Sequence, residues 1–201
     1  NLAYFLQYFK SADTLSAAGD PWMIRVKDLQ LRNMHFLYEN QDKKTGGPGI
    51  DFSDIELSDM DLLMQNLVVD GDTIEGMIRN LTFVEKSGFD LREFSGDARF
   101  SPVGLSVDNL RIITNNSNIN LDFGFRYDDL DAFSDFITEV RFDATFRETG
   151  LEMSDVGYFA PVMFSMTDYI EIEGNFRGTV ANIHGKDFVV KYGDNTRFRG
   201  S

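Results

Sequence analysis

The sequence is dominated by short runs in which apolar and polar residues alternate, each closed by a turn signal. The clearest run is INLDFGFRY, in which every second side chain from Ile119 to Tyr127 is apolar. Because successive side chains of a strand point to opposite faces, this run predicts a strand of about 30 Å with one apolar face. From Ile50 onward such runs recur between turn signals such as VDGDT, SPVG, TNNSN and YGDN. Segments at a spacing of about 8–12 residues predict a mainly β fold with a long, curved, mostly antiparallel sheet.

Three further stretches, residues 140–146, 169–180 and 187–192, alternate in the same way. Gly174 and Gly178 fall in the apolar row of the second stretch, where glycine permits strong local curvature or the close approach of another chain. We therefore expect one apolar face built from Ile119, Leu121, Phe123, Phe125, Tyr127, Val140, Phe142, Phe146, Ile170, Ile172, Phe176, Val180, Phe188, Val190 and Tyr192. An ordinary sandwich, with a second sheet over this face, is the alternative that composition leaves open.

Two segments carry a helical pattern instead. Residues 1–15 space their apolar side chains at helical intervals, which predicts a short amphipathic helix. One further short helix is expected near 154–166, with Ser154 or Asp155 as its N-cap and with Pro161 limiting its length or kinking it.

A weak internal repeat suggests stacked strand units. DLQLRNMHF, residues 28–36, and DIELSDMDL, residues 54–62, share their pattern of acidic, apolar and Asn or Asp positions, and they lie 26 positions apart. A looser version begins at Asp108. Repeated units that cannot bury their faces alone predict an extended sheet, although a plain β-meander would show the same alternation. Within the first unit the apolar phase shifts by one position, which predicts a bulge near Asp28.

Charge and composition restrict the partners and the compartment. The chain has 19 Lys plus Arg and 33 Asp plus Glu, a formal net charge of −14, so we expect no nucleic-acid partner. There is no cysteine, which excludes disulfides, thiol catalysis and Cys-ligated zinc and is compatible with an oxidising periplasm. No apolar run approaches the roughly 18–20 residues that span a membrane.

No arrangement of residues in the sequence resembles a catalytic site. His35 and His184 are the only histidines, and neither has acidic ligands at a metal-site spacing. The pair Asp59 and Asp61, and the acids around Asp128, could supply paired carboxylates for glycoside chemistry, but an acidic chain produces such pairs freely. We therefore expect a protein that is not an enzyme and that has no metal and no other cofactor.

The C-terminal half carries a set of spaced residues that is structural rather than catalytic. The set is Asp155, Phe159 and Pro161, then Gly174, Gly178, Thr179, Val180 and Ile183, then Gly193, Thr196, Phe198 and Gly200. It resembles the TamB and AsmA-like family of envelope proteins, which includes the translocation and assembly module. Upstream, Thr114 and Ser117 resemble that family's T-x-x-S turn between two strands. Residues 103–201 are the most family-like section, in the style of large TamB-like proteins from Bacteroidetes-type bacteria.

The resemblance implies an architecture and a location. Family members have an inner-membrane anchor and a long periplasmic body that curls into a half-open β-taco groove with an apolar lining. For this chain the resemblance implies that residues 1–201 form a single β-rich piece of a larger, repeat-containing protein. That protein would lie in the periplasm and be tethered to the inner membrane by an anchor absent from this stretch.

Two functions from different classes follow from this interpretation. In the first, the groove carries phospholipid acyl chains between the inner and outer membranes during envelope biogenesis. In the alternative, the protein is an assembly scaffold or chaperone that holds outer-membrane β-strands by strand capture. The implied partners are phospholipid acyl chains, neighbouring segments of the full-length protein and an outer-membrane barrel protein. The family's barrel-binding domain is not identifiable in this stretch.

Overall fold

The computed structural model describes residues 23–40, 47–129, 132, 135–166, 168–193 and 195–201. The helix expected in residues 1–15 lies outside the described residues. The strands are β1 (Met23–Glu39), β2 (Asp54–Asp70), β3 (Thr73–Glu85), β4 (Asp90–Leu91), β5 (Glu93–Ser101), β6 (Gly104–Ile113), β7 (Asn118–Arg126), β8 (Arg141–Glu152), β9 (Tyr169–Thr179), β10 (Asn182–Tyr192) and β11 (Thr196–Gly200). The helical elements are α2 (Phe136–Glu139), α3 (Met153–Gly157) and the 3-10 helix η2 (Pro161–Ser165).

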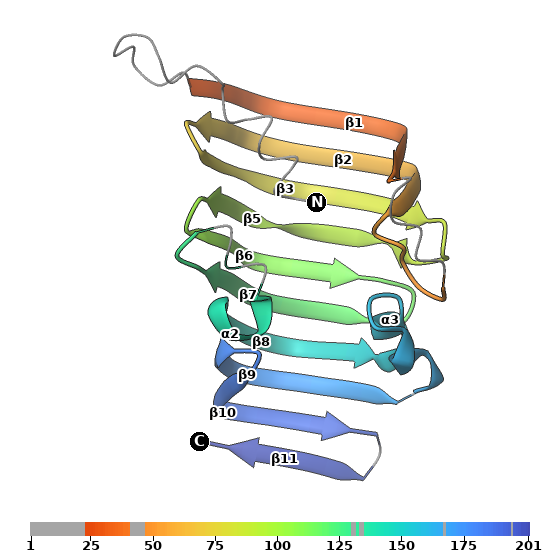
Figure 1. Cartoon of the computed structure of the whole chain (residues 1–201), viewed down its shortest axis with the longest axis vertical. Coiled ribbons are helices and arrows are strands. Elements are labelled where there is room, and N and C mark those ends of the chain that lie inside the picture. Colours follow the sequence, from red (N-terminus) through yellow and green to blue (C-terminus); the bar gives the residue numbers. More distant parts are fainter. Residues whose placement is uncertain (1–22, 41–46, 130–131, 133–134, 167, 194) are drawn as a thin grey trace.

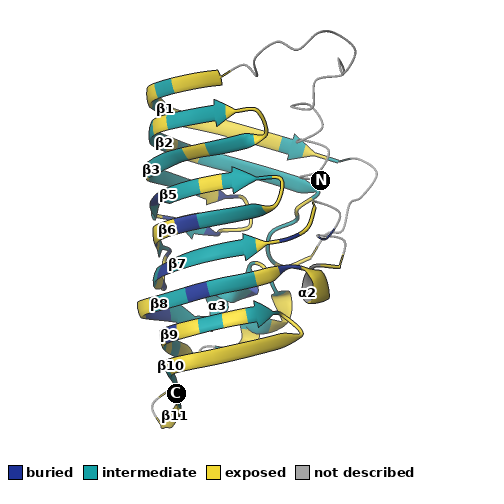
Figure 2. Ribbon diagram, turned by 90° about the vertical axis from the view of Figure 1, so that its left-hand side faces the viewer, coloured by how far each residue is buried: buried dark blue, intermediate teal, exposed yellow. Residues whose placement is uncertain are grey.

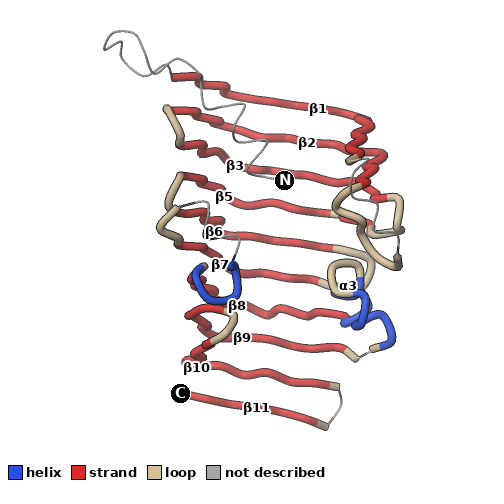
Figure 3. Tube along the Cα trace, viewed as in Figure 1, coloured by secondary structure: helices blue, strands red, loops and turns tan. Residues whose placement is uncertain are grey.

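All the described strands belong to one open antiparallel sheet (Figure 1). The strand order is β1-β2-β3-β5-β6-β7-β8-β9-β10-β11, and the two-residue β4 pairs with β3 beside this path. Strands that are adjacent in the main path are also consecutive along the chain, except that β4 lies between β3 and β5. The connections range from a short turn between β2 and β3 to the segment with α3 and η2 between β8 and β9 (Figure 3). The prediction of a mainly β, antiparallel sheet is confirmed. The sandwich alternative is wrong for the described residues, because no strand among them lies in a second sheet.

Bulges interrupt the long strands at recurring positions. In β6, Val107 pairs with Phe123 and Leu110 pairs with Leu121, so one extra residue is accommodated between these pairs. Asn109, inside this bulge, has φ 53°, a left-handed conformation that Asn tolerates better than most residues. Its neighbour Asp108 is also exposed, so two consecutive polar residues face outward and the apolar phase continues on the other side.

Similar bulges cross the sheet along one line. The left-handed residues are Asn66 in β2, Asn109 in β6, Glu148 in β8 and Asp187 in β10, with φ between 39° and 53°. The register of the strand pairs shifts along the same line. The first of these shifts lies between Gln65 and Val68 of β2, and the last lies between Lys186 and Val189 of β10.

A glycine lies opposite three of these bulges, in the strand that pairs with the bulged one. Gly76 faces the bulge of β2, Gly96 that of β6 and Gly174 that of β10. A Cβ on Gly96 would lie 3.3 Å from the Cα of Leu110, and one on Gly174 would lie 2.5 Å from the Cα of Phe188. Glycine therefore occupies the positions where a bulge brings two backbones closest together.

The internal repeat coincides with another pair of bulges. Asn33 and Asp59 occupy the same position in the two repeat units, and their φ values are 49° and 51°. The backbone N–H of Asn33 donates to Oδ1 of Asp61 at 2.7 Å, just as that of Asn109 donates to Asp122 at 2.7 Å. The bulge expected near Asp28 is not found in the β1–β2 pairing, which runs without a shift from Met23 to Leu31.

The helix expected near 154–166 is two shorter elements, α3 and η2, separated at residues 158–160. Pro161 begins η2, a position where its missing N–H is no loss. The predicted N-cap is wrong: Glu152 precedes α3 and makes no side-chain cap hydrogen bond. Figure 1 shows α2 and α3 on the same face of the sheet, near its opposite sides.

The buried core is small for a chain of this length and centres on β6, β7 and β8 (Figure 2). The main cluster contains Val107, Leu110, Leu121 and Ala144. A second cluster joins Tyr127, Ala132 and Val140 near α2. Burial of the phenol raises the pKa of Tyr127 above its ordinary value.

Candidate functional site

The candidate site is the face of the sheet that carries the main core, here called the apolar face. Leu121 of β7 pairs with Phe146 of β8, and Ile172 of β9 pairs with Val190 of β10. Directly opposite residues of an antiparallel pair project from the same face. The alternation read from the sequence therefore brings its predicted residues together across four successive strands.

Aromatic rings form contacts along this face. The ring centroids of Phe123 and Phe125 are 4.5 Å apart, those of Phe146 and Phe176 are 5.7 Å apart, and those of Phe176 and Phe188 are 5.3 Å apart. The first two pairs meet edge to face, at interplanar angles of 79° and 83°. This is a favoured geometry for aromatic rings, so these pairs strengthen the packing along the strands.

Glycines next to the apolar row leave space that another part of the same chain, Phe188 and its strand β10, occupies. A Cβ on Gly185 would lie 2.7 Å from Cδ1 of Phe188, and one on Gly200 would be closer still to the same ring. Gly174 has φ 116°, which L side chains rarely adopt, and it lies against the backbone of β10. The close approach that the glycines permit is therefore made by Phe188 and its strand.

Most of the predicted apolar residues are half-buried. Val180 differs because it lies in the turn after β9 and is 45% exposed, whereas Val140 is 1% exposed and belongs to the cluster near α2. Leu121 and Tyr127 are also buried. Among the described residues, α2 and α3 lie over the sides of the sheet and no second sheet covers its middle.

The apolar face extends beyond the residues that the alternation in the sequence predicts. Phe94 of β5 and Ile112 of β6 pack against the same core cluster, and Met64 of β2 pairs with Ile78 of β3. Strict alternation of apolar and polar positions does not predict these residues, because each bulge interrupts that alternation. A usable signal exists: at each left-handed bulge residue two polar residues stand side by side, the second Asn, Asp or Glu, with an apolar residue on at least one side of the pair.

A buried polar cluster fixes α3 to the sheet. Ser117 Oγ donates to Oδ2 of Asp155 at 2.6 Å, Asn116 Nδ2 donates to Oδ1 at 3.2 Å, and the hydroxyl of Thr114 also donates to Oδ2. The backbone N–H of Glu152 donates to Ser117 Oγ at 3.0 Å. Thr114, Ser117 and Asp155, which the family motif singles out, are all buried. Their contacts to one another indicate a structural connection between the β6–β7 turn and α3.

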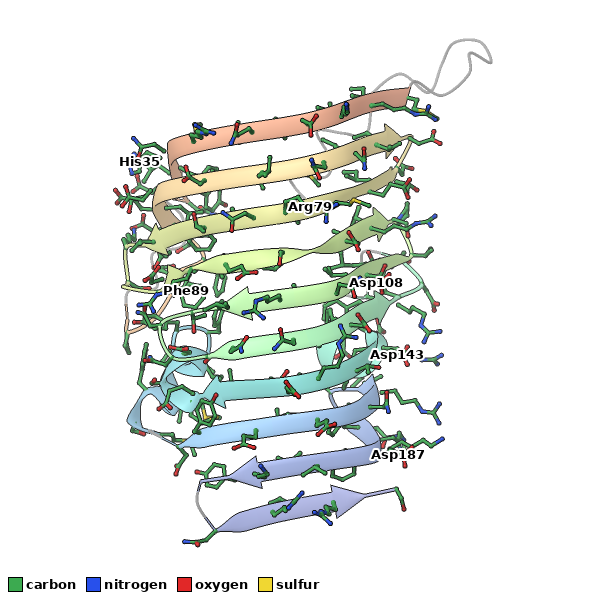
Figure 4. All side chains as sticks on the ribbon, turned by 180° about the vertical axis from the view of Figure 1, so that it is seen from behind. His35, Arg79, Phe89, Asp108, Asp143 and Asp187 are labelled. Atoms are coloured by element: carbon green, nitrogen blue, oxygen red, sulfur yellow. The ribbon has the colours of Figure 1, made fainter. Side chains whose placement is uncertain are left out.

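The opposite face, which faces the viewer in Figure 4, is polar and carries cross-strand ion pairs. Arg147 Nη2 donates to Oδ1 of Asp122 at 2.9 Å. This hydrogen bond, together with that from the backbone of Asn109, holds the pKa of Asp122 below its ordinary value of 3.8. Such pairs select neighbouring strands and keep this face solvated, which fits the strong negative charge of the chain.

The acids and histidines considered for catalysis lie apart from one another or have structural partners. Asp61 accepts the backbone hydrogen bond of Asn33, and Asp59 occupies a left-handed bulge position. His35 Nε2 lies 2.9 Å from Oε1 of Glu56 on an exposed part of β1. In the described part of the chain, no group of three or more His, Asp or Glu side chains is placed to hold a metal ion.

Comparisons with known proteins give no assignment. No protein-family model, no curated protein and no solved structure matches the chain. Within the residues that the structure describes, no helix has the length and apolar character needed to cross a membrane. The resemblance to the TamB and AsmA-like family thus stays a prediction from sequence motifs.

Proposed function

We propose that this chain is a lipid-conducting segment, in which the apolar face forms the lining of a half-open groove for phospholipid acyl chains. The observation that carries the proposal is the continuity of the apolar face across the sheet, with no described layer over its middle. Burying an acyl chain recovers about 0.8 kcal/mol per CH₂ without any directional contact. A lining without specific polar contacts lets a bound chain move along it, because no single position holds it tightly.

The line of bulges supports a concave apolar face. At each bulge an extra residue faces outward, as Asp108 and Asn109 do in β6, so the polar face is locally longer than the apolar one. Bulges bend the strand that carries them and increase its twist. Because the bulges follow one line from β2 to β10, they would bend successive strands in the same place and in the same sense.

The proposal includes the location and partners that the motif resemblance implies. The chain would act in the periplasm as one part of a longer protein tethered to the inner membrane, next to further segments of that protein. It would carry no catalytic activity and no cofactor, and the longer protein would meet an outer-membrane barrel protein through a part that lies outside this stretch. The absence of cysteine and the net charge of −14 fit an oxidising compartment and the absence of nucleic acid.

Native mass spectrometry of the gently purified chain, with organic extraction of co-purifying molecules, tests the proposal. Phe125 and Phe142 are opposite each other on the apolar face, so Phe125→Asp with Phe142→Asp should abolish lipid binding. The control is Asn175→Asp with Asn182→Asp, which adds the same charge on the polar face, with Asn175 opposite Lys186. The proposal predicts bound phospholipid in the parent chain and the control only. A parent chain that takes up no lipid from added vesicles would refute it.

The alternative, strand capture by an assembly scaffold, is favoured by one observation. β1 is a 17-residue edge strand, and its Met23, Ile24 and Leu37 are exposed. Long, apolar, unprotected edges are templates for pairing with another strand. In this case Ile24→Lys with Leu37→Lys would abolish the binding of outer-membrane β-hairpin peptides, whereas the two groove substitutions would leave it intact.

A further inference from the structure

An apolar cavity lies at one end of the apolar face, where α3 meets it. Its volume is about 410 Å³, and its walls include Leu81, Phe83, Phe89, Phe94, Ile112 and Phe159. Ile119 is the only residue of the sequence-predicted set that lines it. Cavities of about 300–1,000 Å³ accommodate small organic ligands, so the space is large enough for a molecule rather than for a few waters.

The polar groups at the wall of the cavity are already bonded to one another. Both carboxylate oxygens of Asp155 accept hydrogen bonds, from Thr114, Ser117 and Asn116. Thr114 Oγ1 accepts from the backbone N–H of Ser117 at 3.0 Å, and Ser117 Oγ accepts from that of Glu152. A polar ligand would have to break this cluster, whereas an apolar ligand would leave it intact.

The wall formed by the α3 segment is held at several points, so the cavity has a defined shape. Tyr158 Oη donates to the carbonyl of Gly88 at 3.1 Å, and the carbonyl of Tyr158 accepts from the backbone N–H of Ile50 at 2.8 Å. The ring of Phe89 meets that of Tyr158 at 5.4 Å and that of Phe159 at 5.2 Å, both edge to face. Three segments distant in sequence therefore meet at this end of the sheet.

We propose that this cavity is a saturable binding site for one acyl chain. The lining and the bonded polar cluster restrict the ligand to an apolar group. The apolar face continues past the cavity through Phe94, Ile112 and Ile119, so a linear chain can enter along it. The inference goes beyond the proposed conduit because it assigns a bounded site at one end of the face. It rests on the proposed function only for the choice of an acyl chain as the occupant.

Photo-crosslinking tests the site. The probe is a long-chain monoacylglycerol with a diazirine at the end of the acyl chain, titrated onto the full 201-residue chain and mapped by peptide mass spectrometry. We expect saturable labelling of peptides covering residues 81–94, 105–119 and 151–159. Ile112→Phe fills the cavity and should lower the apparent affinity at least about tenfold, or about 1.4 kcal/mol. Leu151→Phe fills it from a different strand and repeats the test if the first variant does not fold.

The matched control is Ile172→Phe, the same substitution on the apolar face outside the cavity. It should leave the labelling of the cavity peptides unchanged. Labelling confined to β7–β10, or an equal loss in Ile112→Phe and Ile172→Phe, would overturn the cavity site while leaving the conduit proposal standing. An absence of any labelling would overturn both.

Discussion

Replacing Asp155 with Ala should destabilise the protein strongly, because this carboxylate connects α3 to the β6–β7 turn. The side chain is 5% exposed, and two of its three hydrogen-bond donors, Thr114 and Ser117, are buried as well. Hydrogen bonds to charged groups contribute about 1.5–3 kcal/mol each, and a buried donor left without an acceptor loses the whole contribution. The third donor, Asn116, is exposed and can bond to water instead.

Counting only the two buried hydroxyls at the lower limit gives a loss of about 3 kcal/mol in the free energy of unfolding. Urea unfolding followed by circular dichroism measures this quantity. With an m-value of about 2 kcal/mol/M, the midpoint should fall by about 1.5 M. Asp155→Asn keeps one acceptor oxygen and should have an intermediate effect.

Asp108→Ala is the control, because Asp108 is an exposed acid on the polar face of β6. A surface substitution of this kind is expected to change the free energy of unfolding by no more than about 0.5 kcal/mol. If Asp155→Ala also stayed within that range, the polar cluster would not hold α3 to the sheet, and the reasoning would be refuted. Hydrogen exchange should show the loss of protection concentrated in residues 153–165.

Two further predictions concern the bulges and the polar face. Gly174→Ala should lower the free energy of unfolding, measured in urea, by more than about 2 kcal/mol, because a Cβ there would meet the backbone of β10. Gly71→Ala, at φ 55° with open space around it, should cost only about 1 kcal/mol, and equal losses would contradict the packing argument. The lowered pKa of Asp122 means that its pairing with Arg147 stabilises the fold above the ordinary pKa of 3.8. That contribution is lost as the pH falls through the lowered value. In Arg147→Met, an NMR titration should show that the pKa of Asp122 rises. An unchanged pKa would contradict the assignment of the lowered value to Arg147.

Several elements were predictable because their signals are local. The alternation from Ile119 to Tyr127 predicted β7 and its apolar face, since side-chain direction in a strand depends only on position. Pro161 correctly marked an interruption of the second helical segment. The one predicted bulge is misplaced: the phase shift near Asp28 predicts a disturbed pairing there, but the register between β1 and β2 shifts only after Leu31. Register depends on both strands of a pair, so the change of apolar phase within β1 alone gave the wrong position for the bulge.

The sequence by itself determined the class of the fold and the apolar character of one sheet face. Those properties follow from composition, turn residues and period-two alternation, which act within a few residues of the chain. Only the tertiary structure decided which residues far apart in sequence meet, such as Thr114 with Asp155, 41 positions apart, and Phe89 with Phe159. It also decided that no second sheet covers the apolar face among the described residues and that the bulges fall on one line. These features depend on strand pairing and on long-range packing, whose energies are not encoded in any single segment.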